Sequence, residues 1–408
     1  MTDARPTATP PIEIDAAAGP APLGMPPATF LRDYWQKRPL LVRNAFPGYA
    51  SPIEPEDLAG LACEDGVLAR LIEHDKASDG WKVRHGPFAE DDFPGLPDHD
   101  WTLLVQDVDK WDADIRTLLA HFDFLPRWRI DDVMVSFAAT GGSVGAHVDQ
   151  YDVFLLQAHG QRRWQIDASA HPSLDFRNDV DIKLLREFHP THDWVLQPGD
   201  MLYLPPGVPH HGVAESPCLT FSVGMRAPAA AELLGDYADT LAADAPDELR
   251  YADPDLALPG DAGEIDDAAM QRVEAALHQL RMDDPDRFGD WFGSFITTYR
   301  SAVLPAAEEH PLPRAAMEQA LAGGAQLWRH PWSRMAWRRA RQGGDADPGR
   351  LYAGGAAYPL GLDDARRLAA ADSIDHTLYA GLGESGRAAV AALLAAGHYR
   401  LEQEEDEA

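Results

Sequence analysis

The sequence predicts an α+β protein whose core is a jelly roll of short antiparallel strands, followed by a helical region and a small mixed C-terminal domain. Between residues 128 and 226, short runs of β-branched and aromatic residues alternate with turns rich in Gly and Pro, a pattern typical of β-sandwiches and barrels. Beyond Pro228, apolar residues recur at helical spacing instead. The length of 408 residues exceeds a usual domain about two- to threefold, so more than one domain is expected.

The N-terminal part is predicted to start without regular structure. Residues 1–27 are rich in Pro and Ala and hold few large apolar side chains, which is the composition of a disordered lead-in. We expect order from residue 28 onward. The apolar spacing there predicts a short helix over 30–35, a strand over 39–42, and a second strand over 101–105 followed by another helix.

Six strands are predicted for the core, joined by links of hairpin length. They are Asp132–Ala138, Asp152–Gln157, Arg162–Ile166, Trp194–Gln197, Met201–Leu204 and Leu219–Val223. Strands this short with such links are typical of a sandwich or barrel of the jelly-roll type. Residues 28–228 are therefore predicted to form one domain.

Residues 229–302 are predicted to be helical and to form a dimer interface. Three apolar stripes fall in this region, and the strongest carries Phe288, Trp291, Phe292, Phe295, Ile296 and Tyr299. A stripe this aromatic needs a surface to cover it, so we expect a homodimer through this region; packing against the chain's own core is the alternative. Residues 303–408 mix helices with Gly-rich turns and end in an acidic tail, which predicts a further small domain.

The charge balance indicates which partners the protein attracts. There are 35 basic and 66 acidic residues, for a formal net charge of −31. Such a surface repels the phosphates of nucleic acids and anionic membranes and attracts basic proteins. The segment 328–341 departs from this pattern because it interleaves Trp and Arg, as proteins that bind single-stranded nucleic acid do. We favour a structural role, in which its arginines pair with the acidic surface, and do not expect direct nucleic-acid binding.

Cysteine content and hydropathy indicate in which cellular compartment the protein is expected. Only Cys63 and Cys218 are present, too few for a disulfide framework or a thiolate metal cluster. No apolar stretch approaches the length that spans a bilayer, and the N-terminus lacks the pattern of a secretory signal. The sequence therefore predicts a cytoplasmic protein that does not insert into membranes.

The chemistry-bearing residues lie in the predicted β core. His147 and Asp149 follow the turn Gly141–Gly145, and His210 follows the turn Pro205–Pro209. On a strand, residues two apart point to the same face, so the side chains of His147 and Asp149 can reach one ion. With His210 they form a two-histidine, one-carboxylate set, which leaves coordination positions open on Fe(II) for an oxidant and a cosubstrate.

Other interpretations of these histidines remain open at this point. A lone H-x-D is weak evidence, and His121-Phe122-Asp123 repeats it within a predicted apolar helix end, where packing is the simpler reading. His211 competes with His210 for the third position. The non-functional alternative is that His147, Asp149 and His210 are polar residues of the barrel whose hydrogen bonds are made within the protein.

The motifs of this core resemble those of the JmjC-type oxygenases of the cupin superfamily, and more narrowly those of the bacterial ribosomal oxygenases. The resemblance is carried by Tyr34–Val42, Gly145-x-His147-x-Asp149, Tyr151–Leu156, Gly160–Trp164, Pro198–His210 and Ser222–Pro228. It implies a double-stranded β-helix core, a helical dimerisation region and a winged-helix-like C-terminal domain.

The resemblance also implies roles for single residues. His147, Asp149 and His210 match the iron ligands of the catalytic centre. Arg162 matches the basic residue that binds the distal carboxylate of 2-oxoglutarate, and Ser136 matches a hydroxyl that helps to hold it. Arg163 is expected on the opposite face of the same strand, exposed to water.

The function implied by the resemblance is that of an Fe(II)- and 2-oxoglutarate-dependent dioxygenase, which uses dioxygen to hydroxylate an arginine in a basic large-subunit ribosomal protein, the one numbered sixteen. Two alternatives are a JmjC oxygenase or demethylase with another basic protein target, and a non-catalytic cupin and winged-helix regulator; an intact ligand set with Arg162 argues against the second. A substrate guanidinium needs acidic or hydroxyl-bearing partners at the mouth of the site. The candidates are Asp107, Asp109, Gln150 and Tyr151.

Overall fold

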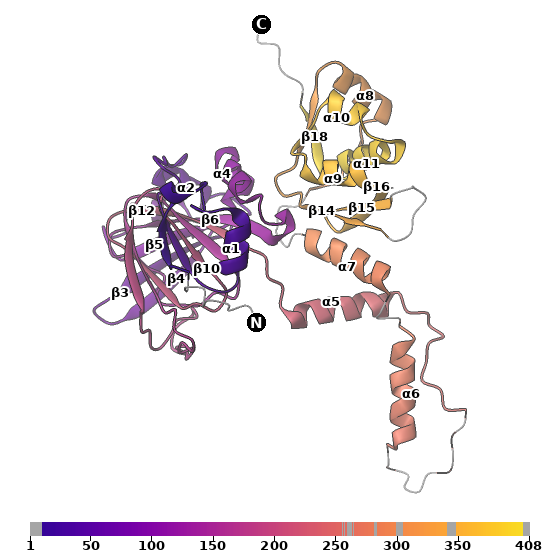
Figure 1. Cartoon of the computed structure of the whole chain (residues 1–408), viewed down its shortest axis with the longest axis horizontal. Coiled ribbons are helices and arrows are strands. Elements are labelled where there is room, and N and C mark those ends of the chain that lie inside the picture. Colours follow the sequence, from indigo (N-terminus) through magenta and orange to yellow (C-terminus); the bar gives the residue numbers. More distant parts are fainter. Residues whose placement is uncertain are drawn as a thin grey trace, which may run out of the picture. The chain divides into compact units, whose positions relative to one another are not determined.

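The computed structural model of the chain describes residues 10–254, 256, 258, 263, 265–280, 284–298, 305–340 and 348–402. The chain divides into two compact units, Met1–Ala227 and Pro228–Ala408. Among the helices of these described ranges, none is long and apolar enough to cross a lipid bilayer. The predicted α+β class is confirmed: strands dominate the first unit, and the second mixes helices with two small sheets (Figure 1).

Two sheets form the first unit in the part of the chain that the structure describes. The larger sheet has nine strands in the order β1-β2-β10-β7-β12-β6-β5-β3-β4, and the smaller has three in the order β11-β8-β9. The strands are β1 Glu13–Asp15, β2 Leu40–Arg43, β3 Ala69–Asp75, β4 Gly80–His85, β5 Trp101–Val105, β6 Ile130–Ala138, β7 Val153–His159, β8 Arg162–Ile166, β9 His192–Leu196, β10 Met201–Leu204, β11 His210–Ala214 and β12 Cys218–Met225. This arrangement confirms the predicted jelly-roll core.

Apolar side chains fill both faces of the larger sheet. Between the two sheets, Leu155 and Leu202 of the larger sheet pack with Trp164 and Ile166 of the smaller one. The opposite face is covered by short helices, which are α1 Pro27–Asp33, α2 Pro55–Leu61, α3 Val108–Trp111 and α4 Ala113–Thr117. Because successive side chains of a strand point to opposite faces, the central strands β7 and β12 are almost entirely buried.

The expectation of a disordered lead-in over 1–27 is wrong for its second half. Glu13–Asp15 form β1, which pairs in parallel with β2, and the Tyr34 hydroxyl donates to the carbonyl of Pro11 at 2.8 Å. Composition predicts the local preference of such a segment, but pairing with a sheet edge satisfies its backbone groups and orders it. Residues 1–9 lie outside the described residues.

The second unit begins with helices α5 Ala230–Ala243, α6 Asp267–His278 and α7 Pro285–Thr297. Trp291, Phe295 and Ile296 of α7 are buried by the chain itself, and the Trp291 indole donates to Asp236 of α5 at 2.7 Å. The expectation that a partner must cover this stripe is therefore wrong for these three side chains. Phe288 stays 48% exposed, and Tyr299 lies outside the described residues.

The remaining elements form a small α/β domain with its own core. They are α8 Arg314–Ala322, β13 Gln326–Arg329, β14 Met335–Arg339, β15 Pro348–Ala353, β16 Ala356–Gly361, α9 Leu362–Ala370, β17 Ser373–Ile374, α10 His376–Ala380, α11 Glu384–Ala395 and β18 Tyr399–Glu402. The described strands pair as β17-β13-β18 and β14-β15-β16. The predicted acidic tail falls on residues 403–408, outside the described residues.

Two arginines of the Trp/Arg-rich segment have structural partners. Arg338 forms ion pairs with Asp286 and Asp290 of α7 at 2.8 and 3.1 Å, and Arg329 donates to the carbonyls of Leu368 and Ala369. The predicted structural role is confirmed for these two side chains.

Candidate metal centre and its pocket

His147, Asp149 and His210 converge on one point of the first unit. One ligand atom of each lies within 4.8 Å of the other two, and the Asp149 carboxylate is 3.9 Å from His147 Nε2 and 3.6 Å from His210 Nε2. His147 and Asp149 belong to the link between β6 and β7, whereas His210 opens β11. A two-histidine, one-carboxylate set of this kind can hold Fe(II) with positions left open.

Main-chain carbonyls fix the orientation of both imidazoles. His147 Nδ1 lies 2.9 Å from the carbonyl of Gly145, and His210 Nδ1 lies 2.9 Å from that of Val208. A proton on Nδ1 donates to the carbonyl and leaves Nε2 unprotonated toward the shared point, which is the usual support for a metal-bound histidine. Burial and the neighbouring His147 hold the pKa of His210 well below its ordinary value, which keeps its ring neutral.

Gly145 is required by the turn that delivers His147. Its φ is +81°, and a Cβ added there would lie 2.5 Å from Leu184 Cδ2. The left-handed backbone and the close approach of Leu184 both favour glycine. His211, the rival of His210, faces away from the cluster and lines a neighbouring cavity.

A cavity of about 540 Å³ opens beside the three side chains, and Arg162 lies at one end of it. The Arg162 side chain is buried, with 2% of the residue exposed. Its guanidinium makes two long hydrogen bonds of 3.4 Å, to Ser136 Oγ and to the carbonyl of Gly212, and its Nε has no partner among the described residues. A buried cation with so few acceptors has the capacity to bind an anion that enters the cavity.

Arg163 lies on the other face of β8, as predicted. It forms ion pairs with Asp193 and Glu215 at 2.7 and 2.6 Å and remains partly exposed, because burial alternates along β8. The period of two along a strand therefore separates two adjacent arginines into a cavity group and a surface group.

The cavity continues along β6 to a second, acidic end. Asp132, Met134 and Ser136 share the face of β6 that lines it. Asp132 and Ser136 are four positions apart, which corresponds to roughly 13 Å along a strand. The cavity thus has room for one ligand beside Arg162 and another beside Asp132, with the three converging side chains also lining it.

Asp132 is the most perturbed acid of this cavity. Burial, followed by the charges of Asp107, Asp109 and Asp131, raises its pKa to about 7. One carboxylate oxygen accepts the backbone N–H of Asp107 at 3.1 Å. An acid whose ionised form is this costly can be relieved by a cation placed against it.

Of the four residues predicted at the mouth of the site, one lines the cavity and three do not. Tyr151 lines the cavity. Asp107 and Asp109 are buried and do not line it; Asp109 instead pairs with Lys110 and accepts the backbone N–H of Val133. Gln150 is exposed and is not part of the cavity wall either. The buried aspartates act on the cavity indirectly, through the pKa of Asp132.

The sequence interpretation missed two parts of the site. It did not predict β11, which begins at His210, because Gly212 and the preceding prolines weaken the strand signal. It also missed Asp132. This residue lies four positions before Ser136 on a predicted strand, so the alternation of side chains already placed both on the same face. The decoy His121 packs edge-on against Phe46, with ring centroids 5.1 Å apart, as expected for a packing residue.

Comparisons with known proteins agree with this geometry. The JmjC domain family matches residues 117–233, and the ROXA-like winged helix family matches residues 279–400. The AraC-like ligand binding domain family matches residues 189–285, overlapping the first of these. The fold is that of a JmjC-type oxygenase, and the winged-helix-like C-terminal domain is confirmed.

Similar proteins show to which family of JmjC-type oxygenases the chain belongs. The chain is 37% identical over 300 residues to the ribosomal protein uL16 3-hydroxylase of Escherichia coli K12, covering 74% of this chain and 79% of that protein. It is 42% identical over 282 residues to a probable ribosomal oxygenase of Haemophilus influenzae, covering 69% and 68%. The chain belongs to the ribosomal oxygenase family.

Solved structures of a family member have the same fold. An X-ray structure of Escherichia coli YcfD matches with a TM-score of 0.81 at 33% identity, over 93% of this chain and 99% of that one. A second structure of YcfD, in complex with cobalt and 2-oxoglutarate, matches with a TM-score of 0.78 at the same identity and coverage.

Asp132→Asn is expected to stabilise the protein. The raised pKa of Asp132 means that its contribution to stability is present below about pH 4 and is lost as the pH rises toward 7. The gain in unfolding free energy from Asn should therefore be larger at pH 8 than at pH 5.5, by ~1–2 kcal/mol. Urea unfolding at the two pH values measures this, with the exposed Asp91→Asn as control; an equal effect of Asp132→Asn at both would show that the carboxyl ionises normally.

Proposed function

We propose that this protein is an Fe(II)- and 2-oxoglutarate-dependent dioxygenase that hydroxylates an arginine of a basic large-subunit ribosomal protein, with uL16 as the expected target. The observation that carries the proposal is one cavity lined by a metal-binding set, by an under-partnered buried guanidinium and by a carboxyl with a raised pKa. The family membership supports it, since the relative in Escherichia coli is a uL16 3-hydroxylase.

The proposed iron ligands are His147, Asp149 and His210. The donor set fits Fe(II), because two neutral imidazoles and one carboxylate bind it while leaving positions for oxygen and a cosubstrate. Both imidazoles are already held by main-chain carbonyls with Nε2 free, so little reorganisation is needed on binding.

The proposed site for the distal carboxylate of 2-oxoglutarate is formed by Arg162 and Ser136. Among the described residues the Nε of Arg162 has no hydrogen-bond partner, and the other two hydrogen bonds of the guanidinium are long. The guanidinium can therefore accept a carboxylate, which it binds with two short, parallel hydrogen bonds. The Trp164 ring lies 5.0 Å from the guanidinium carbon and helps to keep this end of the cavity dry.

The acidic end of the same cavity is the proposed position of the substrate guanidinium. Asp132 supplies a carboxylate, and Tyr151 also lines the cavity wall. A cationic substrate group lowers the pKa of Asp132 and draws the carboxylate into its ionised form. The separation along β6 leaves the carbon chain of the substrate arginine near the converging ligands.

When bound, iron with 2-oxoglutarate and dioxygen supplies the oxidising chemistry that converts a substrate C–H bond to C–OH while 2-oxoglutarate leaves as succinate and carbon dioxide. The chain's own residues position the reactants. Arg162 anchors the cosubstrate, Asp132 anchors the substrate, and Val153 and Leu155 line the cavity between them and exclude water.

Two alternatives from the sequence remain to be separated by experiment. Another basic protein as target, or demethylation, would use the same iron site. A non-catalytic regulator would leave the described ligand set and Arg162 without a role. The proposed cytoplasmic location follows from a ribosomal substrate.

Mass spectrometry of ribosomes from cells with and without this gene tests the assignment. We expect the mass of one added oxygen atom on a single arginine of uL16 only when the gene is present. Succinate formation by the purified protein, with and without uL16, is the companion measurement. An unmodified uL16 together with oxidation of another protein would keep the iron chemistry and reject the substrate.

His147→Ala and Asp149→Ala are expected to lose Fe(II) binding and 2-oxoglutarate turnover. Two remaining ligands cannot hold the facial geometry that oxygen activation needs. Calorimetry with Fe(II) under anaerobic conditions and succinate assays measure the two losses, with His211→Ala as the matched control. Full turnover by both variants would exclude this metal centre.

Arg162→Ala is expected to weaken 2-oxoglutarate binding by about 2–5 kcal/mol, because the distal carboxylate loses its buried partner. Arg163→Ala removes two exposed ion pairs and should change binding by less than ~1 kcal/mol. The Michaelis constant for 2-oxoglutarate, measured for each variant, gives the effect of each substitution. Equal effects from the two arginines would contradict the assignment.

The proposed homodimer forms through α6. None of the described α6 side chains is buried, and Met270, Val273 and Leu277 lie exposed along it at helical spacing. Val273→Glu combined with Leu277→Glu should give a monomer in light scattering at micromolar concentration, whereas Glu274→Gln should not. A wild-type protein that is already monomeric would reject the dimer.

A further inference from the structure

A short hairpin, residues 175–186, contributes one wall of the cavity. Phe176 and Leu185 form a β-bridge, and the N–H of Arg177 donates to the carbonyl of Leu184 at 2.8 Å. Near its tip the hairpin places Asp181–Leu184 on the wall of the cavity that also contains the metal-binding set. The hairpin lies in the long link between β8 and β9, so its place depends on contacts rather than on short connections.

The same hairpin touches the segment that carries His147. The N–H of Leu185 donates to the carbonyl of Ala146 at 2.8 Å, and Leu184 packs against Gly145. The hairpin therefore borders both the cavity wall and the segment that carries one proposed iron ligand, and its Leu184–Leu185 side is held there by these backbone and packing contacts.

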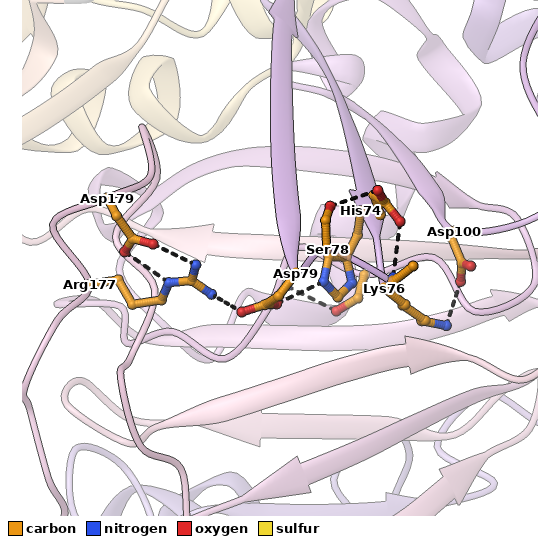
Figure 2. A network of polar contacts seen from close by, with 11 residues as sticks. His74, Lys76, Ser78, Asp79, Asp100, Arg177 and Asp179 are labelled. Carbon is orange, nitrogen blue, oxygen red and sulfur yellow. Dashed lines mark hydrogen bonds and ion pairs between the residues drawn. The ribbon is translucent and has the colours of Figure 1, made fainter.

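An ion pair joins this hairpin to the β3–β4 turn. Arg177 Nη1 lies 2.6 Å from Asp79, across 98 residues of sequence, while Nε and Nη2 of the same guanidinium bind Asp179 within the hairpin. Figure 2 shows Arg177 between the two carboxylates. The Arg177 side chain is 18% exposed and that of Asp79 is 65% exposed, so solvent screens part of the charge of this pair and its geometry matters more than its Coulomb energy.

The turn that presents Asp79 is itself held by local contacts. Asp79 accepts from His74 at 3.1 Å, and the His74 ring stacks on Trp81 with centroids 3.9 Å apart. Ser78 donates to Asp75 at 2.6 Å, and Lys76 pairs with Asp100 (Figure 2). Asp79 is thus a fixed anchor against which Arg177 can hold the hairpin.

We propose that Asp79 and Arg177 are positioning residues for the hydroxylation. They hold the hairpin 175–186 so that Asp181–Leu184 form the wall against which the substrate chain beside the reacting arginine lies. Neither residue touches the proposed iron or 2-oxoglutarate groups; each acts through the hairpin. This inference rests on the proposed function and adds a determinant of protein-substrate binding to it.

The test compares Asp79→Asn with Asp179→Asn. Both neutralise one carboxylate on the same guanidinium, but only Asp79 belongs to the β3–β4 turn. Asn tolerates the left-handed φ of +53° at position 79, so the exchange leaves the turn unstrained. We expect Asp79→Asn to raise the Michaelis constant for uL16 by about three- to tenfold, with the constant for 2-oxoglutarate and the Fe(II) affinity unchanged. Asp179→Asn should have less than half that effect.

A double-mutant cycle and hydrogen exchange complete the test. Arg177→Gln removes the pairs with both Asp79 and Asp179, so it should be at least as severe as Asp79→Asn. The double variant should be no worse than Arg177→Gln alone, because the Asp79 pair is already lost in it. The amides of 177–186 should exchange faster in Asp79→Asn than in the wild type. Additive effects, unchanged exchange, or equal effects of Asp79→Asn and Asp179→Asn would overturn the inference.

Failure of the proposed function gives a different result. A wild-type protein that binds Fe(II) and 2-oxoglutarate but adds no oxygen to uL16 would reject the substrate, and hydrogen exchange would then decide whether Asp79 holds the hairpin. A general loss of fold in Asp79→Asn would lower the affinity for Fe(II) and raise the Michaelis constants for both 2-oxoglutarate and uL16, and would also count against a positioning role.

Discussion

Two main-chain hydrogen bonds of 3.0 Å join His147 and His210, each residue donating its N–H to the carbonyl of the other. They tie the link between β6 and β7 to the start of β11, which belongs to the smaller sheet. Through this contact, residues 63 positions apart in the sequence meet with their rings 4.2 Å apart. The geometry of the metal-binding set and the cavity beside it depend on this contact. So does the hairpin 175–186, which hydrogen-bonds to Ala146.

One face of β6 then divides the cavity into two chemical environments. Ser136 stands at the end where Arg162 is short of acceptors, and Asp132 stands at the end where four aspartates crowd together. The same register continues on β12, where Thr220 pairs with Ser136 and Gly224 pairs with Asp132. In the proposed function, complementary charge directs a dicarboxylate and a cationic side chain to opposite ends of the cavity.

This arrangement has a cost in stability. A buried guanidinium with an unpartnered Nε and a carboxyl with a pKa near 7 both disfavour the folded state on their own. Such groups are found where a ligand completes them. The overall charge of −31 acts at longer range, since it attracts a basic protein before any of its side chains can reach the acidic end of the cavity.

The sequence by itself determined what is local. Strands such as Trp101–Val105 and Arg162–Ile166 were predictable to the residue, and the period of two placed Arg162 and Arg163 on opposite faces. The H-x-D motif and His210 were recognisable because their turns need specific glycines and prolines. Tertiary structure decided what depends on distant partners: the order of Glu13–Asp15 against β2, and the covering of Trp291 by α5. The role of the hairpin 175–186 falls in the same class, because pairing and burial arise between segments far apart in the chain, where local preference carries no information.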